Sequence, residues 1–249
     1  MRYELKPRST VELIDGAFKL VRDNLWGFVE IEAPLALLAL IQLLLYGGPH
    51  HTRAVSLLSP AASDALSRIF MALATGLDRF LLPVATVAAF EGTTVSLEAS
   101  LRRSWKVRWP LIALTLLLSY SLLFSGSLFS IKPKWLATLL LVPMLGFTYL
   151  LIRWSLSFAA LFAEPRGALR RSASLLDGAF GRIFWPTLVS LLAYFLGWIT
   201  VHKLFHATPV AEALCTAATY SFFGPIQTAF VTLLYFDQRI RREGLGLAM

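Results

Sequence analysis

The chain has 249 residues, of which 57% are hydrophobic and only 15% are charged, and 23 Lys and Arg against 15 Asp and Glu give it a formal charge of +8. A water-soluble domain usually carries about 25% charged residues, so this composition, with a mean hydropathy of +0.65, excludes an ordinary soluble domain and indicates a protein in a bilayer. The cations form short clusters between apolar runs without an aromatic-rich polar surface, which excludes nucleic acid as a partner.

The first segment of the chain predicts an amphipathic helix near the amino terminus. Apolar residues recur there every three or four positions, at Val11, Ile14, Phe18, Val21 and Leu25. Ser9 followed by Glu12 forms a capping box that begins such a helix. Because no small-residue cleavage site follows the first apolar run, we expect an uncleaved membrane anchor rather than a signal peptide.

Six apolar runs are long enough to cross a hydrocarbon layer of ~30 Å as helices of roughly 20 residues. They are 27–46, 69–90, 110–131, 135–160, 183–204 and 211–236. Because the runs are continuous and do not alternate with a period of two, they predict helices rather than barrel strands. The expected fold is an all-α integral membrane protein with six transmembrane helices arranged as three hairpins.

The distribution of cations predicts the orientation in the membrane. An even number of spans puts both termini on one side, and the segments on that side hold sixteen Lys and Arg, against four in the opposite loops. These segments are 1–26, 91–109, 164–182 and 237–249. Since cytoplasmic loops carry the excess of Lys and Arg, we expect a multi-pass protein of the bacterial inner membrane with both termini in the cytoplasm.

Two further amphipathic stripes precede pairs of spans, and short strings recur among the three. The stripes comprise Leu97, Leu101 and Trp105, then Leu169, Ala173, Leu176, Phe180 and Ile183. The string LIDGAF at 13–18 is echoed by LLDGAF at 175–180, and LRRS occurs at both 101–104 and 169–172.

These echoes predict three tandem units, about 9–90, 95–163 and 166–240, within a single membrane domain 1–249. Each unit would be a cytoplasmic interfacial helix followed by a transmembrane hairpin, with pseudo-threefold symmetry between the units. The alternative is that any amphipathic helix before a hairpin has this appearance.

Two stretches of the chain resemble a known bacterial membrane family. They are VPMLGFTYLLIRWS at 142–155, followed by Glu164 and ALRRS at 168–172, and LYFDQRIRREG at 234–244. The chain is similar to the membrane domain attached to some bacterial glycerophosphodiester phosphodiesterases and to its stand-alone relatives. The resemblance implies a six-helix inner-membrane protein, but not the phosphodiesterase activity, which belongs to a separate soluble barrel. The stand-alone relatives have no settled biochemical role.

Five ionisable residues fall inside the expected spans, where a charge is costly unless it meets a partner or water. They are Glu30, Glu32, Asp78, Arg79 and Arg153. We expect Asp78 to pair with Arg153 near the midplane, and Glu32 to reach towards Arg79. The cluster is interpreted as a fixed ion-pair network that joins three spans, with a polar cavity for a lipid head group or an ion as the alternative.

Two histidines form a candidate metal site on the outer side. His202 and His206 lie one helical turn apart, which is a chelating spacing, and Glu212 is a possible further ligand. The pair lacks the glutamate of an H-E-x-x-H site, and histidines are common at interfacial helix ends, so a structural role is the competing interpretation.

Four cytoplasmic arginines are candidates for contact with lipid or a partner protein. They are Arg102, Arg103, Arg170 and Arg171. Each cation near a membrane surface contributes about 1 kcal/mol of attraction to anionic phospholipids. The alternative is that they follow the positive-inside bias without specificity.

The chain carries no nucleophile or nucleotide-binding signature, and we expect neither an enzyme nor a cofactor. It has no G-x-S-x-G, G-x-x-x-x-G-K or G-x-G-x-x-G, and its one cysteine, Cys215, has no adjacent base. The leading hypothesis is a non-catalytic membrane protein that organises anionic lipid or docks a membrane-protein partner as an accessory or assembly subunit. The alternatives are a small transporter or permease component that uses the buried charges, and a metal-dependent membrane enzyme.

Overall fold

The computed structural model describes residues 7–46, 80–115, 149, 153, 155–163, 167–205 and 209–244, and every regular element in these ranges is a helix. The expected all-α class is therefore confirmed for this part of the chain. Within the same ranges, no helix combines the length and the hydropathy that crossing a bilayer requires. Three of the expected spans, 27–46, 183–204 and 211–236, fall inside described helices, and the other three extend into residues outside the described ranges.

The first helix, α1 (Thr10–Asp23), begins at the predicted capping box. The Glu12 N–H donates to Ser9 Oγ at 3.3 Å, and the Ser9 N–H donates to Glu12 Oε2 at 2.6 Å. At the other end, the side-chain amide of Asn24 donates to the main-chain oxygen of Leu20 at 2.9 Å. Local side chains thus satisfy backbone groups that a helix end leaves without partners.

The buried face of α1 coincides only in part with the apolar stripe expected from the sequence, since Val21 is buried and Ile14 packs against the core. Leu13, Ala17 and Leu20 are buried, whereas Val11 is 75% exposed and Phe18 is 47% exposed. The helix has apolar residues on two sides, and packing against α10 (Pro209–Glu243) covers only one of them. The spacing predicted the helix and part of its buried face correctly. It missed Leu13, Ala17 and Leu20, because periodicity alone does not say which side of a helix meets a neighbour.

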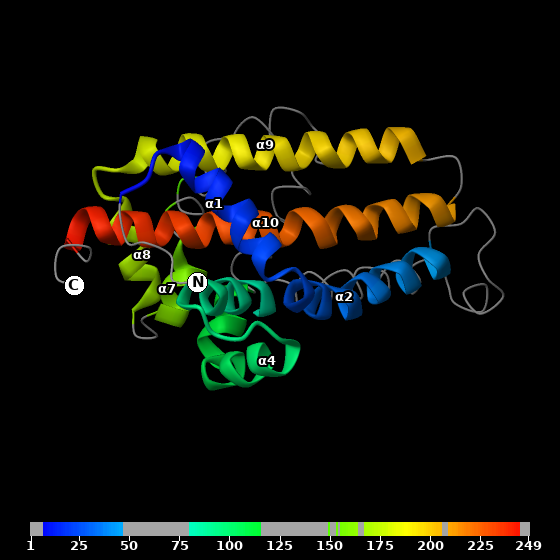
Figure 1. The fold of residues 1–249 in the computed structure, drawn as a ribbon, viewed down its shortest axis with the longest axis horizontal. Coiled ribbons are helices and arrows are strands. Elements are labelled where there is room, and N and C mark those ends of the chain that lie inside the picture. The colour runs from blue at the N-terminus through cyan, green and yellow to red at the C-terminus, as the bar shows by residue number, and fades with distance from the viewer. Residues whose placement is uncertain are drawn as a thin grey trace, which may run out of the picture.

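Three long helices form the frame of the described part of the molecule. Figure 1 shows α9 (Phe180–Phe205) and α10 side by side along the longest axis, with α2 (Leu25–Tyr46) on the opposite side of α10. The helix α1 crosses α10. Each long helix contains one internal proline, where the ring removes a backbone donor.

The core lies where the helical segment 80–91 and α7 (Ser157–Ala163) join α10. Every residue from 81 to 89 is buried. The hydroxyls of Thr86 and Thr232 are hydrogen-bonded at 2.8 Å, so these buried polar groups satisfy each other. The core is therefore built from the second expected span of each unit or its end, namely the segment 80–91, α7 and α10.

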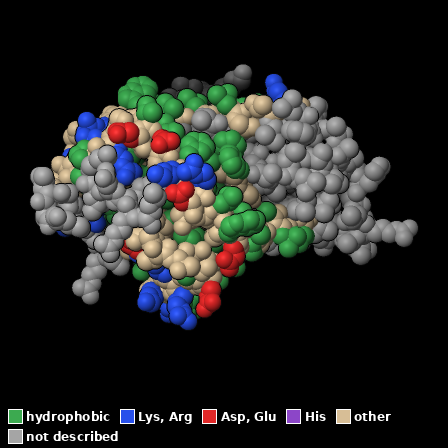
Figure 2. All heavy atoms as spheres, viewed as in Figure 1, with side chains coloured by type: hydrophobic (Ala, Val, Ile, Leu, Met, Phe, Trp, Pro, Cys, Tyr) green, Lys and Arg blue, Asp and Glu red, His purple; other side chains and the backbone are tan. Residues whose placement is uncertain are grey.

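The helix α9, which contains the expected span 183–204, is apolar on its exposed side. Its exposed large apolar side chains follow one another at intervals of three and four residues, at Trp185, Val189, Leu192, Leu196 and Ile199. Figure 2 shows hydrophobic side chains along the edge of the molecule where α9 lies. A continuous exposed stripe of this kind is typical of an interaction surface, whereas isolated exposed leucines are ordinary.

The three shorter helices α1, α4 (Leu97–Lys106) and α8 (Ala168–Leu176) each pack on a second helical segment of another unit. The helix α8 contacts α7, α4 bonds to the segment 80–91, and α1 contacts α10. Thus α4 contacts the end of the first expected unit, α8 the end of the second and α1 the end of the third, as in a closed ring of units. The three-unit repeat remains a prediction, and these contacts follow its order.

The contact of α1 with α10 includes a hydrogen-bonded junction between the two ends of the chain. The Arg8 N–H donates to Asp237 Oδ1 at 2.7 Å, and Arg241 Nε donates to Asp237 Oδ2 at 2.8 Å. The Arg241 guanidinium also donates to the main-chain oxygen of Arg8 at 2.7 Å. Asp237 is only 3% exposed, so these bonds offset the cost of burying its charge.

Candidate functional site

The helix α4 places three cations in its carboxy-terminal half. It begins at Ser96, whose hydroxyl accepts the Ala99 N–H at 3.2 Å, and it carries Glu98 in the first turn. The cations Arg102, Arg103 and Lys106 follow, towards the end of the helix where the dipole favours positive charge.

The burial of α4 is the reverse of that in an amphipathic helix of a soluble protein. Ser100 and Ser104 are 2% and 0% exposed, whereas Leu101 and Trp105 are 44% and 66% exposed. A helix on a soluble core turns its apolar face inward and its polar face to water. Here the two serines face the protein, while Leu101 and Trp105 face outward and only Leu97, at the start of the helix, packs against the core.

Within the string LRRS at 101–104, the last two residues attach α4 to the protein. Arg103 donates to the two carboxylate oxygens of Glu91 at 2.7 and 3.1 Å, and to the main-chain oxygen of Phe162 at 3.5 Å. Ser104 Oγ donates to the main-chain oxygen of Phe80 at 3.3 Å. Sequence reasoning missed Glu91, although it is an acidic residue at the end of an apolar run, next to an arginine-rich helix.

The same division occurs in the second LRRS string, on α8. Ser172 Oγ donates to the main-chain oxygen of Arg153 at 2.7 Å, and Arg171 pairs with Glu243. The first arginine of each string is not attached in this way. Arg170 is exposed, and Arg102 has only a contact of 3.8 Å with Glu98. Arg103 and Arg171 therefore bind other parts of this chain, and contact of the four arginines with lipid or a partner protein stays a prediction.

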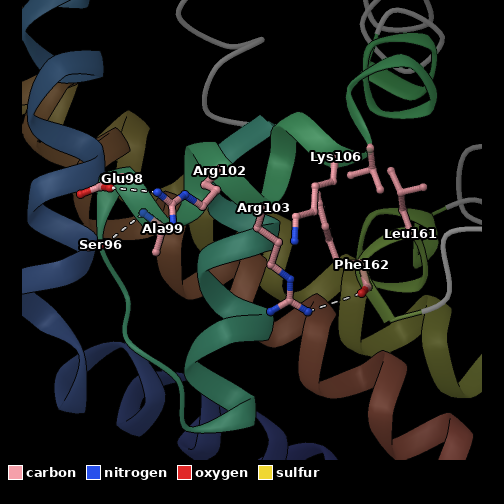
Figure 3. A pocket seen from close by; sticks show the side chains of 9 residues that line it. Ser96, Glu98, Ala99, Arg102, Arg103, Lys106, Leu161 and Phe162 are labelled. Atoms are coloured by element: carbon pink, nitrogen blue, oxygen red, sulfur yellow. Dashed lines mark hydrogen bonds and ion pairs between the residues drawn. The ribbon is translucent and has the colours of Figure 1, made fainter.

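A groove of about 570 Å³ lies between α4 and α7. Its lining combines the three cations of α4 and Glu98 with the apolar side chains of Val107, Leu161 and Phe162. Figure 3 shows Arg103 and Lys106 extending from α4 towards Phe162, while Arg102 turns towards Glu98. Sequence reasoning missed Lys106, which lies four residues after Arg102 and therefore on the same side of the helix.

A second groove, of about 560 Å³, lies between α1 and α10. Lys19 and Arg22 line it, together with Asp15 and apolar side chains from both helices. The lining thus holds two cations and one carboxylate, against three cations and one carboxylate in the groove beside α4. The groove beside α4 therefore has the greater excess of positive charge.

The buried charge cluster expected from the sequence is not formed by the residues that the structure describes. Glu32 is 4% exposed, but Glu30 is exposed, and Arg153 pairs with Asp177, at the end of α8. The depth of Arg153 in a membrane stays a prediction. Asp78 and Arg79 lie outside the described ranges.

The expected histidine site is only partly covered by the structure. His202 lies in α9, but the structure does not describe its side chain, and His206 lies outside the described ranges. Elsewhere in the described part of the chain, no group of three His, Cys, Asp or Glu side chains is arranged to hold a metal ion. The outer metal site therefore stays a prediction.

Comparison with known proteins adds no relative, because no family model, curated protein or solved structure matches this chain.

Proposed function

We propose that this chain is a non-catalytic integral membrane protein of a bacterial inner membrane. Its helices α1, α4 and α8 lie at the cytoplasmic surface, where they hold anionic phospholipid or dock a membrane-protein partner. The composition of the whole chain, its six apolar runs and the excess of cations in the segments assigned to the cytoplasm support this proposal. The resemblance to the membrane domain of glycerophosphodiester phosphodiesterases also supports it.

One observation carries the proposal: α4 buries Ser100 and Ser104 and exposes Leu101 and Trp105. In water this orientation would leave Leu101 and Trp105 solvated, without the free-energy gain of burying them. At a membrane surface, the same side chains enter the boundary between head groups and acyl chains, while neighbouring cations stay among the head groups. Arg102 and Lys106, exposed on α4 beside Trp105, supply those cations.

Exposed tryptophans occupy matching places in the three predicted units. Trp26, Trp109 and Trp185 are 81%, 71% and 63% exposed, and each lies close to the start of a predicted first span. Tryptophan is enriched at membrane interfaces because its ring is apolar while its N–H seeks a polar partner. The stripe that continues from Trp185 along α9 then suits contact with acyl chains.

Spin labels on α4 test the proposed orientation. In a Cys215→Ser background, single cysteines at Leu101, Trp105 and Thr94 are labelled with a nitroxide in reconstituted full-length protein. We expect the labels at 101 and 105 to be relaxed more by lipid-soluble oxygen than by a water-soluble nickel chelate. The label at 94, in the exposed polar segment before α4, should show the opposite preference. Equal, water-like accessibility at all three positions would overturn the proposal.

Native mass spectrometry of protein extracted gently from its own membranes separates the two roles. A second protein in fixed ratio would identify an accessory or assembly subunit. Retained anionic lipid without a protein partner would identify a lipid-organising protein. The transporter alternative depends on the buried charge cluster, and with Glu30 exposed and Arg153 paired to Asp177 no observation in the described part of the chain favours it.

A further inference from the structure

The groove between α4 and α7 combines fixed positive charge with an apolar wall. Three positive side chains and one negative side chain line it, namely Arg102, Arg103, Lys106 and Glu98. Leu161 and Phe162 are 1% and 7% exposed, so the wall opposite α4 belongs to the packed core and is held in place. A ligand that fits both parts has an anionic head and a hydrocarbon portion.

The cations of the groove have different tasks. The guanidinium of Arg103 is engaged by Glu91 and Phe162, which keeps α4 against α7 and defines one side of the groove. Lys106 is exposed and makes no ion pair within the described ranges. Arg102 lies one turn earlier, and its contact with Glu98 joins two side chains that are 80% and 87% exposed, so it is easily exchanged for another anion.

We infer that this groove binds the phosphate of an anionic phospholipid, with Lys106 and Arg102 as the phosphate ligands and Leu161 and Phe162 as the wall for its tail. This inference rests on the proposed function, since it gives the membrane contact a site and a ligand class. The phosphate takes the place of Glu98 beside Arg102, and Lys106 gains a counter-ion. Arg103 is a positioning residue, and its own carboxylate partner remains in place.

The apolar wall distinguishes a lipid from free phosphate. Inorganic phosphate would use only the cations, and exposed cations bind it weakly in water. A phospholipid adds burial of its first methylene groups, which gain free energy when they are removed from water. The second groove, beside α1, offers apolar walls as well, but two cations and one carboxylate line it, so its smaller excess of positive charge leaves less attraction for an anionic head.

The test uses purified full-length protein in mixed micelles with a photoactivatable phosphatidylglycerol, and the cross-linked peptides are identified by mass spectrometry. We expect adducts in the peptides that contain residues 96–107 and 161–162. Unlabelled phosphatidylglycerol should suppress these adducts, and phosphatidylcholine and inorganic phosphate should not. Equal suppression by inorganic phosphate would overturn the lipid assignment and identify the groove as a site for free phosphate.

Paired variants separate this site from general attraction to the membrane. Removing two surface cations costs about 1 kcal/mol each, so Arg102→Gln with Lys106→Gln should weaken binding at the groove about 30-fold. Arg22→Gln with Arg182→Gln removes the same charge at other exposed positions and should leave the groove adducts unchanged. Ala99→Trp fills the groove without changing its charge and should also abolish them.

The outcomes also separate this inference from the proposed function. An equal loss in both double variants would overturn the site but leave a general anionic-lipid surface intact. A wild-type protein that does not discriminate phosphatidylglycerol from phosphatidylcholine at any peptide would overturn the lipid role itself. Melting temperatures of all variants are measured in parallel, and Ala99→Trp keeps the test decisive if the double variant unfolds.

Discussion

The main-chain N–H of Arg8 donates a 2.7 Å hydrogen bond to Asp237 across a separation of 229 residues. This bond joins the segment before α1 to the last helix of the chain, while α4 and α8 are attached to earlier helices by serine hydroxyls. The short helices are thus held by polar contacts to main-chain or buried groups, which leaves their outward apolar side chains free for another surface.

The junction between the two ends of the chain should depend on the charge of Asp237. We expect Asp237→Asn to reduce the free energy of unfolding by about 2 kcal/mol, because hydrogen bonds to a buried ion are stronger than neutral ones. Thermal unfolding of the detergent-purified chain measures the effect. Asp15→Asn, an equal change of charge at an exposed position on α1, serves as the control. Equal shifts for both variants would refute a structural role for the junction.

The docking serines give a second prediction. Ser104→Ala and Ser172→Ala should each cost about 1 kcal/mol, because each removes the hydroxyl donor from a carbonyl in another helical segment. Their effects should add, since they involve separate helices. Ser174→Ala is the matched control, because Ser174 Oγ bonds to Arg171 O within its own helix. A loss as large for Ser174→Ala would show that helix stability rather than docking is being measured.

Replacing Arg103 should lower the free energy of unfolding more than replacing Arg102, the other arginine of α4. Arg103→Gln breaks a bidentate pair with Glu91, whose side chains are 32% and 38% exposed, and should cost about 1 kcal/mol. Arg102→Gln should change the free energy of unfolding by less than about 0.5 kcal/mol, since its contact is fully solvated. A double-mutant cycle with Glu91→Gln isolates the pair, and zero coupling energy would contradict the assignment.

Gly27, near the start of α2, makes a close approach that leaves no room for a side chain. A Cβ there would collide with the main-chain oxygen of Val95 and lie 2.7 Å from its Cγ1. Gly27→Ala should therefore destabilise the protein by about 1–3 kcal/mol, even though alanine favours helices. At Gly181 in α9 a Cβ meets nothing within 4 Å, so Gly181→Ala should stabilise by about 0.5 kcal/mol. Matching melting shifts in the two variants would contradict the close approach.

Local signals in the sequence correctly predicted the structural features that depend only on residues close together in the chain. The capping box of Ser9 and Glu12, the helical class and the short helix around Leu101 depend on backbone geometry within a few residues, and the described part of the chain confirms them. A pairing between residues far apart in the chain is harder to predict from the sequence. Asp177, which the structure pairs with Arg153, was not among the expected partners, and the expected partner Asp78 lies outside the described ranges.

The sequence by itself determined the helical class, the apolar composition and the positions of the cationic clusters, since hydropathy, periodicity and charge are properties of the residues in order. Only the tertiary structure decided which face of each short helix is covered. It turned Ser104 inward and Trp105 outward, and it assigned Arg103 to Glu91 while leaving Arg102 exposed. The physical reason is that burial and ion pairing depend on which other segments of the chain pack against a helix. The periodic pattern of one helix does not specify those contacts.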